Sequence, residues 1–475
     1  MGPPCAGRFD IDVDGKLYSG SYMKPKDLDY LPALPDIVRA GVAAVKIEGR
    51  FKSPRYVRAT TTALRYALDA IRDGRDPTLP PKIRRRLERT RFFGSSAGYM
   101  GSRRPETDAI ALDIKVGRFN RAWDLFTTPR TLALVPKMLG RKVASAFSTP
   151  PPPLTVRAEM DPDVQQRLAG PLPRKSPEII VDTRFDYSAF PKGADRICIG
   201  EKFCAISFLA RCSAVPELAA RARDVGAKPY LTLPARVPER LANQLLAKVE
   251  ELRMHVDGAL CLDIGVASRV SQIMPVTLSA LVQSRTAIRS LRDLTGAEAV
   301  RPYHLPLPLY LQHGFPDVPL HIPVFGRHVV DGMMFCISRL WGPCPEREIK
   351  TYKTRFEDAH DLLLSGTHLY SAKTFSAHPL RPQFLRLPVT GLVVDSFGHD
   401  AVTLERVIDY WKGNGEWMLP EDELCNGMLL ENSPTGGFGC GGSRGSWHEW
   451  NPGLDKMLFE SGSFAIDVAR QPGGS

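Results

Sequence analysis

Charged side chains are concentrated in one short stretch, where Lys46, Glu48, Arg50 and Lys52 alternate with other residues in "KIEGRFK". The guanidinium of Arg50 can donate two parallel hydrogen bonds to a carboxylate or phosphate. Glu48 can orient a neighbouring cation or transfer a proton. Two interpretations follow: a catalytic site for an anionic substrate, formed by Lys46, Glu48 and Arg50, or a set of structural ion pairs.

A second set of candidates consists of cysteines. Cys204 follows one predicted strand, and Cys336 and Cys344 follow another in "MMFCISRLWGPCPERE". Thiolates are the usual ligands of iron–sulfur clusters, which take four of them. The pattern allows a metal or iron–sulfur site with these three ligands, although it identifies no fourth. Cys198 and Cys261 lie inside apolar strands and are interpreted as core residues.

The elements that position these cysteines are predicted by a regular alternation of apolar runs and helical patterns. The predicted strands cover residues 196–200, 228–233, 258–263, 276–281, 299–305, 320–326 and 391–396. Short apolar strands separated by helices indicate parallel βαβ units buried on both faces. Residues 178–430 are therefore predicted to form a (β/α)₈ TIM-barrel-like domain of the α/β class. In such barrels the functional groups lie at the carboxyl ends of the strands.

The charged stretch belongs to a separate amino-terminal segment. "FDIDVDGKLYSG" predicts a hairpin that turns at Asp14-Gly15, in preference to a calcium loop, because a calcium loop needs Glu where Ser21 stands. Residues 42–47 predict a strand, and residues 54–71 predict a helix capped by Ser53. Such a partial αβ half-barrel cannot bury its strand on both faces, so the segment needs a partner.

Proline- and glycine-rich stretches suggest the domain boundaries. The predicted divisions are a partial barrel at 1–105, a linker at 106–177, the barrel at 178–430 and a flexible tail at 431–475. "GSSAG", which contains Ser96, matches a nucleophile-elbow pattern but lacks the apolar strand that an elbow requires. The Gly-x-Gly-x-x-Gly match at Gly437 lies in the tail and is not preceded by a strand, so it does not predict a dinucleotide site.

Composition limits the class of protein. The chain has 475 residues, a net charge of +11 and a pI near 9.2. No run approaches the ~18 apolar residues of a membrane-spanning helix, and the first residues do not resemble a secretory signal. We therefore expect a cytoplasmic or organellar protein without a membrane span. The positive charge favours anionic partners, such as nucleic acid or small carboxylates, or is simply a feature of the solvated surface.

Several quoted motifs resemble one known family. "AVKIEGRFKSPRYV" strongly resembles the Lys-Ile-Glu-Gly-Arg-x-Lys-Ser signature of the collagenase-like U-thirty-two peptidase family. "YMKPKDLDYLPALPDIVRAGV" and "RRRLERTRFFGSSAGYMGSRR" resemble the segments that flank this signature. The resemblance covers residues 5–104, corresponds to the carboxyl half of a family barrel, and is closest to UbiU-type and transfer-RNA hydroxylase-type members. The amino half of that barrel is not present, which suggests a truncated or incomplete chain.

Residues 178–430 resemble a second, UbiV-type member through "ADRICIGEKFC", "FGRHVVDGMMFCISRLWGPC" and "ELCNGM". The resemblance implies a barrel that holds a 4Fe-4S cluster and hydroxylates without molecular oxygen, with prephenate as the oxygen donor. Cys204, Cys336 and Cys344 would be ligands of the cluster. Lys46, Glu48 and Arg50 would bind the donor, and a second family member would be the heterodimer partner. Asp29 stands where UbiU-type proteins tend to have cysteine.

Three hypotheses about function follow. The first is an iron–sulfur-dependent hydroxylase or its subunit, acting on a ubiquinone precursor or on transfer or ribosomal RNA. The second is a collagenase-like peptidase, the historical label of the family. The third is a non-catalytic partner that binds RNA or protein.

Overall fold

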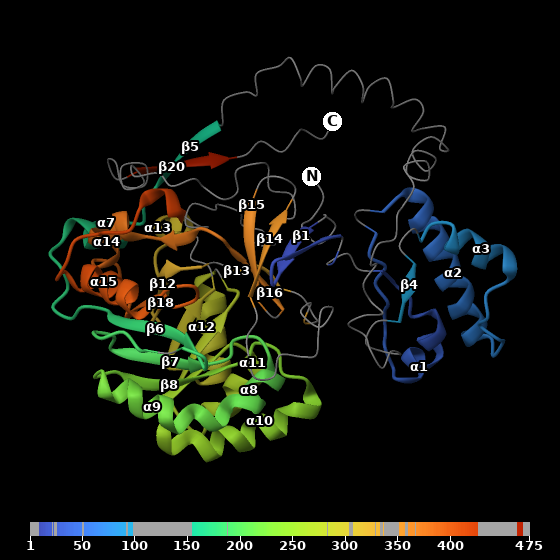
Figure 1. Cartoon of the computed structure of the whole chain (residues 1–475). Coiled ribbons are helices and arrows are strands. Elements are labelled where there is room, and N and C mark those ends of the chain that lie inside the picture. The colour runs from blue at the N-terminus through green and yellow to red at the C-terminus, as the bar shows by residue number, and fades with distance from the viewer. Residues whose placement is uncertain are drawn as a thin grey trace. The chain divides into compact units, whose positions relative to one another are not determined.

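The computed structural model describes residues 9–20, 22, 26–49, 52–91, 94–97, 154–187, 189–282, 284–303, 307–327, 329–332, 336, 351–356, 360–365, 367–425 and 463–468. The chain divides into two compact units. One comprises Gly2–Ile11 and Lys16–Pro152, and the other comprises Met1, Asp12–Gly15 and Pro153–Ser475. We call them the amino-terminal unit and the barrel unit and describe each by itself (Figure 1).

Parallel strands form the centre of the barrel unit. They are β6 (Glu178–Arg184), β7 (Arg196–Gly200), β8 (Lys228–Leu233), β9 (Gly258–Cys261), β10 (Val276–Ala280), β11 (Ala299–Pro302), β12 (His321–Gly326) and β18 (Gly391–Asp395). The hydrogen-bonded order is β11-β10-β9-β8-β7-β6-β18-β12, and every one of these pairs is parallel. A parallel bridge between Val300 and Leu320 joins β11 to β12. The ring closes, so the predicted TIM-barrel-like α/β fold is confirmed.

Helices connect the strands of the ring. They are α8 (Ala205–Arg211), α9 (Val215–Asp224), α10 (Glu239–Leu252), α11 (Ile264–Val270), α12 (Arg285–Thr295), α13 (Leu307–His313) and α15 (Ala401–Lys412), with short 3₁₀ turns at Cys212–Ala214 and Arg253–His255. Polar side chains fix several helix starts, because each accepts a hydrogen bond from a backbone N–H of the first turn. Asp263, Ser284 and Asp400 do so at α11, α12 and α15.

The strands are apolar on both faces, as their sequences predict. Ile179 and Val181 of β6 point outward into the large core shared with the helices. Ile180 points inward and packs against Cys198, Tyr230, Leu260 and Val393. Because side chains alternate along a strand, Asp182 and Arg184 share the inward face with Ile180. The apolar cluster around Ile180 therefore fills the interior of the barrel. The polar side chains of Asp182 and Arg184 lie closer to the carboxyl ends of the strands.

A long insertion lies between β12 and β18. It contains β13 (Val329–Gly332), β14 (Thr351–Phe356), β15 (His360–Ser365), β16 (His368–Ser371), β17 (Thr374–Ser376), a 3₁₀ turn (His378–Leu380) and α14 (Arg381–Phe384). Strands β13, β16, β15 and β14 are neighbours in that order, and the three pairings between them are antiparallel. β17 pairs with the end of β12 and with β19 (Leu424–Cys425), which follows a 3₁₀ turn at Glu421–Glu423.

Secondary structure also occurs where we predicted only linker and tail. β5 (Leu154–Glu159) and α7 (Pro162–Ala169) lie in the predicted linker, and β20 (Ser463–Val468) lies in the predicted tail. β5 and β20 pair antiparallel along their whole lengths. The glycine- and proline-rich composition around these segments obscured them, because each strand is defined by a partner about 300 positions away.

The amino-terminal part of the chain begins with β1 (Phe9–Val13) and β2 (Lys16–Gly20). Asp14 and Gly15 both have positive φ, the geometry of a type I′ turn, so the predicted hairpin turn is confirmed. A 3₁₀ turn (Leu31–Ala33), α1 (Leu34–Arg39), α2 (Pro54–Arg72) and α3 (Pro81–Glu88) follow. The Ser53 hydroxyl accepts from the N–H of Tyr56 and caps α2, as predicted. β3 (Asp27–Leu28) and β4 (Ser95–Ser96) form a short parallel pair.

The prediction of a strand at residues 42–47 is wrong. This segment has no regular secondary structure, and its side chains are exposed, with Val42 and Val45 at 51% and 41%. A strand requires a hydrogen-bonded neighbour, and no strand among the described residues pairs with it. The apolar pattern is real, but the described residues do not provide the partner that would bury it.

None of the described helices is both long enough and apolar enough to cross a membrane.

Candidate functional site

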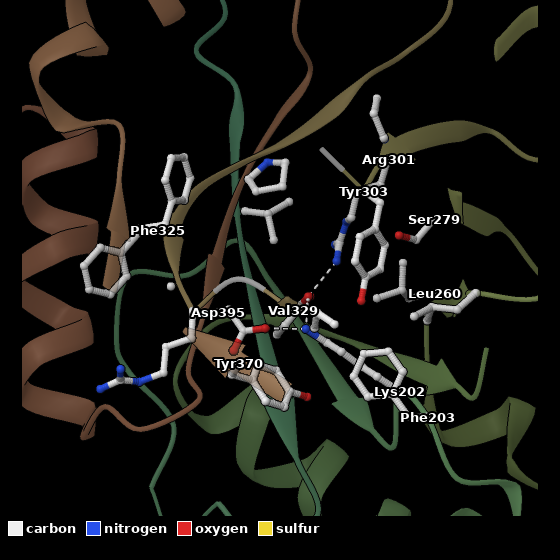
Figure 2. A pocket seen from close by; sticks show the side chains of 18 residues that line it. Lys202, Phe203, Leu260, Ser279, Arg301, Tyr303, Phe325, Val329, Tyr370 and Asp395 are labelled. Atoms are coloured by element: carbon white, nitrogen blue, oxygen red, sulfur yellow. Dashed lines mark hydrogen bonds and ion pairs between the residues drawn. The ribbon is translucent and has the colours of Figure 1, made fainter. Parts of the chain in front are cut away.

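The carboxyl ends of the barrel strands surround a cavity of about 80 Å³ (Figure 2). Charged residues from four strand ends line it: Asp182 from β6, Lys202 after β7, Arg301 from β11 and Asp395 from β18. Such a volume holds several water-sized groups, since one water needs about 10–15 Å³. The cavity lies where barrel folds place their functional groups.

The four charged residues form one network. The Asp182 carboxylate accepts from Arg301 at 2.6 Å and pairs with the Lys202 ammonium at 2.8 Å. Lys202 also donates to Asp395, so its ammonium lies between two carboxylates. Asp182 and Arg301 are only 3% and 4% exposed. Burial of these charges is tolerable because each one has an opposite partner within hydrogen-bond distance.

The network keeps Asp182, Lys202 and Arg301 ionised. Burial alone would raise the pKa of Asp182, but Arg301 and Lys202 outweigh it and hold that pKa at about 2. Burial opposes the charge on Lys202 as well, yet Asp182 and Asp395 raise the pKa of its ammonium above the ordinary 10.5. A protonated lysine has no lone pair, so Lys202 is suited to hold an anion and unsuited to act as a nucleophile.

Aromatic residues supply the remaining walls and two phenol groups. Phe203 and Phe325 line the cavity together with Tyr303 and Tyr370. Burial raises the pKa of Tyr303 well above 10 and raises that of Tyr370 to about 12. Both phenols therefore stay protonated at neutral pH and can donate a hydrogen bond into the cavity.

Arg327, directly after β12, brings a third cation to the cavity. One of its terminal nitrogens donates to the carbonyl oxygens of Ser371 and Ala372 in the turn after β16. Burial lowers the pKa of its guanidinium from the ordinary arginine value of 12.5. The group still remains charged at neutral pH because that ordinary pKa is so high. The cavity thus has three cations, Lys202, Arg301 and Arg327, against the carboxylates of Asp182 and Asp395.

Several buried polar atoms around the cavity have no hydrogen-bond partner among the described residues. They are Asp182 Oδ1, Arg301 Nε and Arg327 Nε. A buried donor or acceptor without a partner costs about 1–3 kcal/mol. These atoms have almost no accessible surface, so this cost lies in the packed polar layer, and the case for a binding site comes from the charged lining of the cavity.

A second cavity of about 20 Å³ adjoins the first. It shares Asp182, Lys202, Phe203, Tyr370 and Asp395 with it and adds residues that include Arg184 and Glu201. Arg184 donates to Ser365 at 3.2 Å and to the Tyr370 hydroxyl at 3.4 Å, and it stacks over the ring of Phe397 at 4.1 Å. The insertion strand β16 is thus attached to the barrel mouth.

Comparison with known proteins gives a family for one part of the chain. Residues 5–109 match the model of Peptidase family U32. This segment is therefore similar to peptidase family U32. Within the part of the segment that the structure describes lie α1, α2, α3 and the exposed residues 42–47.

Two solved structures show weak similarity to the chain. One is the U32 peptidase Mk0906, 14% identical, with 34% of this chain and 74% of that one covered and a TM-score of 0.26. The other is the type I 3-dehydroquinate dehydratase of Clostridium difficile, 14% identical, with 32% and 76% covered and a TM-score of 0.22. At these scores neither structure supports an argument about the site.

The charged residues predicted as catalytic all lie in the U32 segment. Lys46 and Glu48 are exposed on the extended stretch after α1, and neither lines either of the two cavities. Arg50 lies outside the described residues. Lys52 pairs with Asp27. The roles of Lys46, Glu48 and Arg50 remain predictions.

The predicted cysteine ligands are only partly described. Cys204 and Cys336 are partly exposed, and Cys344 lies outside the described residues. Cys204 begins α8, two positions after Lys202, and its sulfur accepts from the N–H of Ser207 at 3.4 Å. Within the described ranges no group of three or more His, Cys, Asp or Glu side chains is arranged to hold a metal ion.

The cysteines interpreted as core residues are buried. Cys198 lies inside the barrel and Cys261 lies in the shell beneath the helices. Burial raises the pKa of Cys198 to about 12 and raises that of Cys261 as well. Their thiols stay protonated at neutral pH, which makes them poor metal ligands. The core interpretation of these two residues is confirmed.

Sequence reasoning missed the residues that surround the cavity. A charged residue lies close to the end of several barrel strands, in "VDTR", "IGEK", "VRPY", "VFGR" and "VVDS". Functional groups of a barrel lie at the carboxyl ends of its strands. The KIEGRFK stretch does not follow a strand among the described residues, whereas these charged residues lie close to strand ends. β6 was also not predicted, and with it Asp182 was overlooked.

Proposed function

We propose that the barrel unit binds a small anionic organic molecule at the mouth of the barrel, and that the chain is a hydroxylase-type U32 family protein. A carboxylate-bearing oxygen donor of the prephenate type is the ligand class. The main support is the lining of the cavity, in which three cations, Lys202, Arg301 and Arg327, face the two carboxylates of Asp182 and Asp395. The resemblance of residues 178–430 to UbiV-type proteins supports the reaction class.

The residues of the cavity have distinct parts in this proposal. The Arg327 side chain lines the cavity and would bind one anionic group of the ligand through its guanidinium. Arg301 and Lys202 are held in place by Asp182 and contribute positive potential without changing protonation state. The phenols of Tyr303 and Tyr370 donate to ligand oxygens. Phe203 and Phe325 exclude water from the apolar part of the ligand, which strengthens the polar contacts.

Calorimetric titration tests the binding proposal. We expect prephenate and citrate to bind with a Kd of roughly 10 μM to 1 mM, and more weakly at higher salt. The matched control is trimethyl citrate, which keeps the carbon skeleton without the charges and should not bind. Equal affinity for citrate and its ester would contradict an anion site.

An iron–sulfur cluster would need ligands beyond those described. The described residues contribute Cys204 and Cys336, whereas such a cluster takes four ligands. Cys344 and a further ligand would have to come from outside the described ranges. The hydrogen bond from the Ser207 N–H fixes the Cys204 sulfur at the start of α8, which is compatible with a ligand role. When bound, a cluster would supply electrons for hydroxylation, and we derive no step through it.

Iron and sulfide analysis of anaerobically purified protein tests the cluster. We expect about four iron and four sulfide per chain, with most of the iron lost in Cys204→Ala and in Cys336→Ala. Cys212→Ala is the control, because Cys212 lies in the packed shell and is not a proposed ligand. A colourless wild-type protein without iron would remove the cluster from the proposal and leave the anion site untouched.

The peptidase hypothesis has less support in this chain. Ser96, from the elbow-like motif, lies in the two-residue strand β4, which pairs with β3 and is far shorter than the apolar strand that an elbow follows. The network at the barrel mouth contains carboxylates, a lysine and arginines, with the lysine protonated. We therefore favour binding of an anionic small molecule over peptide hydrolysis.

A cationic surface supports a second candidate function, RNA binding by the amino-terminal unit. Residues 52–91 contain twelve Lys and Arg against four Asp and Glu. On α3, Leu87 faces inward, and five cations are exposed without an ion pair among the described residues: Lys82, Arg84, Arg85, Arg86 and Arg89. Such a cluster on one short helix suits a phosphate backbone.

Fluorescence anisotropy with a labelled single-stranded RNA tests this candidate. Changing Arg84, Arg85 and Arg86 together to Gln should weaken binding and reduce the slope of log K against log salt by about 2, since each phosphate contact contributes about 0.7. A control with Arg289, Arg292 and Arg406 changed to Gln removes the same charge from exposed positions of the barrel unit. Equal loss in the two triple variants would indicate only a general charge effect.

A further inference from the structure

A stacked pair of rings joins the barrel mouth to the insertion. Phe203, which follows Lys202, lies face to face with the His368 imidazole, with ring centroids 3.5 Å apart and an interplanar angle of 22°. His368 begins β16, outside the ring of barrel strands, and is 6% exposed. The contact therefore connects the loop after β7 with a strand of the small antiparallel sheet.

The same strand supplies part of the cavity wall. Tyr370 lies two positions after His368, lines both cavities and meets Phe203 edge-on at 6.4 Å. Since side chains alternate along a strand, His368 and Tyr370 project from the same face of β16. On its other side Tyr370 packs against Phe397 at 4.4 Å. The wall formed by β16 is thus held at two points by aromatic contacts.

The loop held by this stack carries the main groups of the site. Residues 201–204 comprise Glu201, whose carboxylate accepts from the N–H of Phe203 at 3.2 Å, then Lys202, Phe203 and Cys204. Lys202 and Cys204 are the chain neighbours of Phe203. If Phe203 moved, the backbone that positions the Lys202 ammonium and the Cys204 thiol would move with it. The imidazole itself is orientated by a 2.7 Å contact between its Nδ1 and the hydroxyl of Thr367.

We infer that His368 is a positioning residue, which holds Phe203 and thereby sets the place of the Lys202 ammonium for the anionic ligand and the exposure of the Cys204 thiol. For the ligand this inference rests on the proposed function, and for the thiol it does not. Burial lowers the pKa of His368 to about 3, so the ring is neutral and its role at neutral pH is stacking and not charge.

Two measurements on His368→Ala test the inference. We expect prephenate to bind about 3- to 10-fold more weakly in calorimetry, because the wall and the ammonium are no longer fixed. We also expect iodoacetamide to alkylate Cys204 several-fold faster in protein freed of iron by a chelator, as followed by mass spectrometry of the peptide that contains it. His368→Phe keeps a stacking ring without its nitrogens and should restore both values towards wild type.

His313→Ala removes an exposed histidine at the end of α13 and should change neither value. Thermal midpoints of all variants establish that the compared proteins are folded. A folded His368→Ala protein that alkylates at the wild-type rate would overturn the positioning role. If the wild-type protein binds no prephenate, the proposed ligand fails, and the alkylation rates still decide the role of His368.

Discussion

Replacing Asp182 with asparagine should lower the free energy of unfolding of the barrel unit by about 3–5 kcal/mol, the range seen when one partner of a buried ion pair is removed. Asp182 contacts both Arg301 and Lys202 and is 3% exposed. The variant keeps the shape of the side chain and removes its charge, which leaves Arg301 buried without a counter-ion. Urea denaturation followed by circular dichroism measures the change.

Asp224→Asn is the matched control for this variant. Asp224 lies at the exposed end of α9 and makes no ion pair with a described residue, so its replacement should cost within about 0.5 kcal/mol. A cost at Asp182 equal to that at Asp224 would mean that the buried network does not stabilise the barrel.

Acid titration gives an independent test of the same network. The folded-state pKa of Asp182 is about 2 and its ordinary value is 3.8. Because the folded pKa is the lower one, the contribution of Asp182 is present above pH 4 and is lost as the pH falls from about 4 to 2. The expected loss is about 2 kcal/mol at 1.36 kcal/mol per unit. Asp182→Asn should remove this part of the pH dependence.

Replacing Arg327 with glutamine should weaken the binding of prephenate or citrate by roughly 10- to 100-fold. A hydrogen bond to a charged group contributes about 1.5–3 kcal/mol, and 1.4 kcal/mol corresponds to a factor of ten. Lys202 and Arg301 form ion pairs with carboxylates of the cavity, whereas Arg327 forms none with a described residue. Its terminal nitrogen donates to a backbone carbonyl, and its Nε has no hydrogen-bond partner among the described residues. Calorimetric titration at a temperature where both proteins are folded measures the affinity.

Two further variants make this prediction specific. Arg327→Lys keeps the charge without the planar donor fork and should recover only part of the affinity. Arg289→Gln removes an exposed charge on α12 and should leave the affinity unchanged. If Arg327→Gln binds as tightly as wild type, the ligand is not held by this guanidinium.

The barrel could be predicted from sequence because its strands are short, apolar and separated by amphipathic helices. Strands such as residues 196–200 and 228–233 are fully specified by this local pattern, and the structure has them at those positions. β5 and β20 could not be predicted in this way, since each is a strand only because the other pairs with it. Residues 42–47 show the converse case, an apolar pattern without a strand partner among the described residues.

The site was harder to predict for a related reason. Asp182, Lys202, Arg301 and Asp395 come from four separate strand ends, and only the closed ring brings them together. Lys46 and Glu48 were predicted as site residues because they are close in sequence. Closeness in sequence does not show which residues meet in a barrel, whose neighbouring strand ends come from distant parts of the chain. Tyr370 carries no local signal at all, since its place depends on the insertion after β12.

A crystal structure of the protein grown with prephenate or citrate tests the central claim most directly. The proposal predicts electron density for the anion between Arg327, Arg301 and Lys202, with a carboxylate oxygen within hydrogen-bond distance of the Arg327 guanidinium. An anion found only elsewhere on the molecule, with ordered water filling this cavity at saturating ligand, would contradict it.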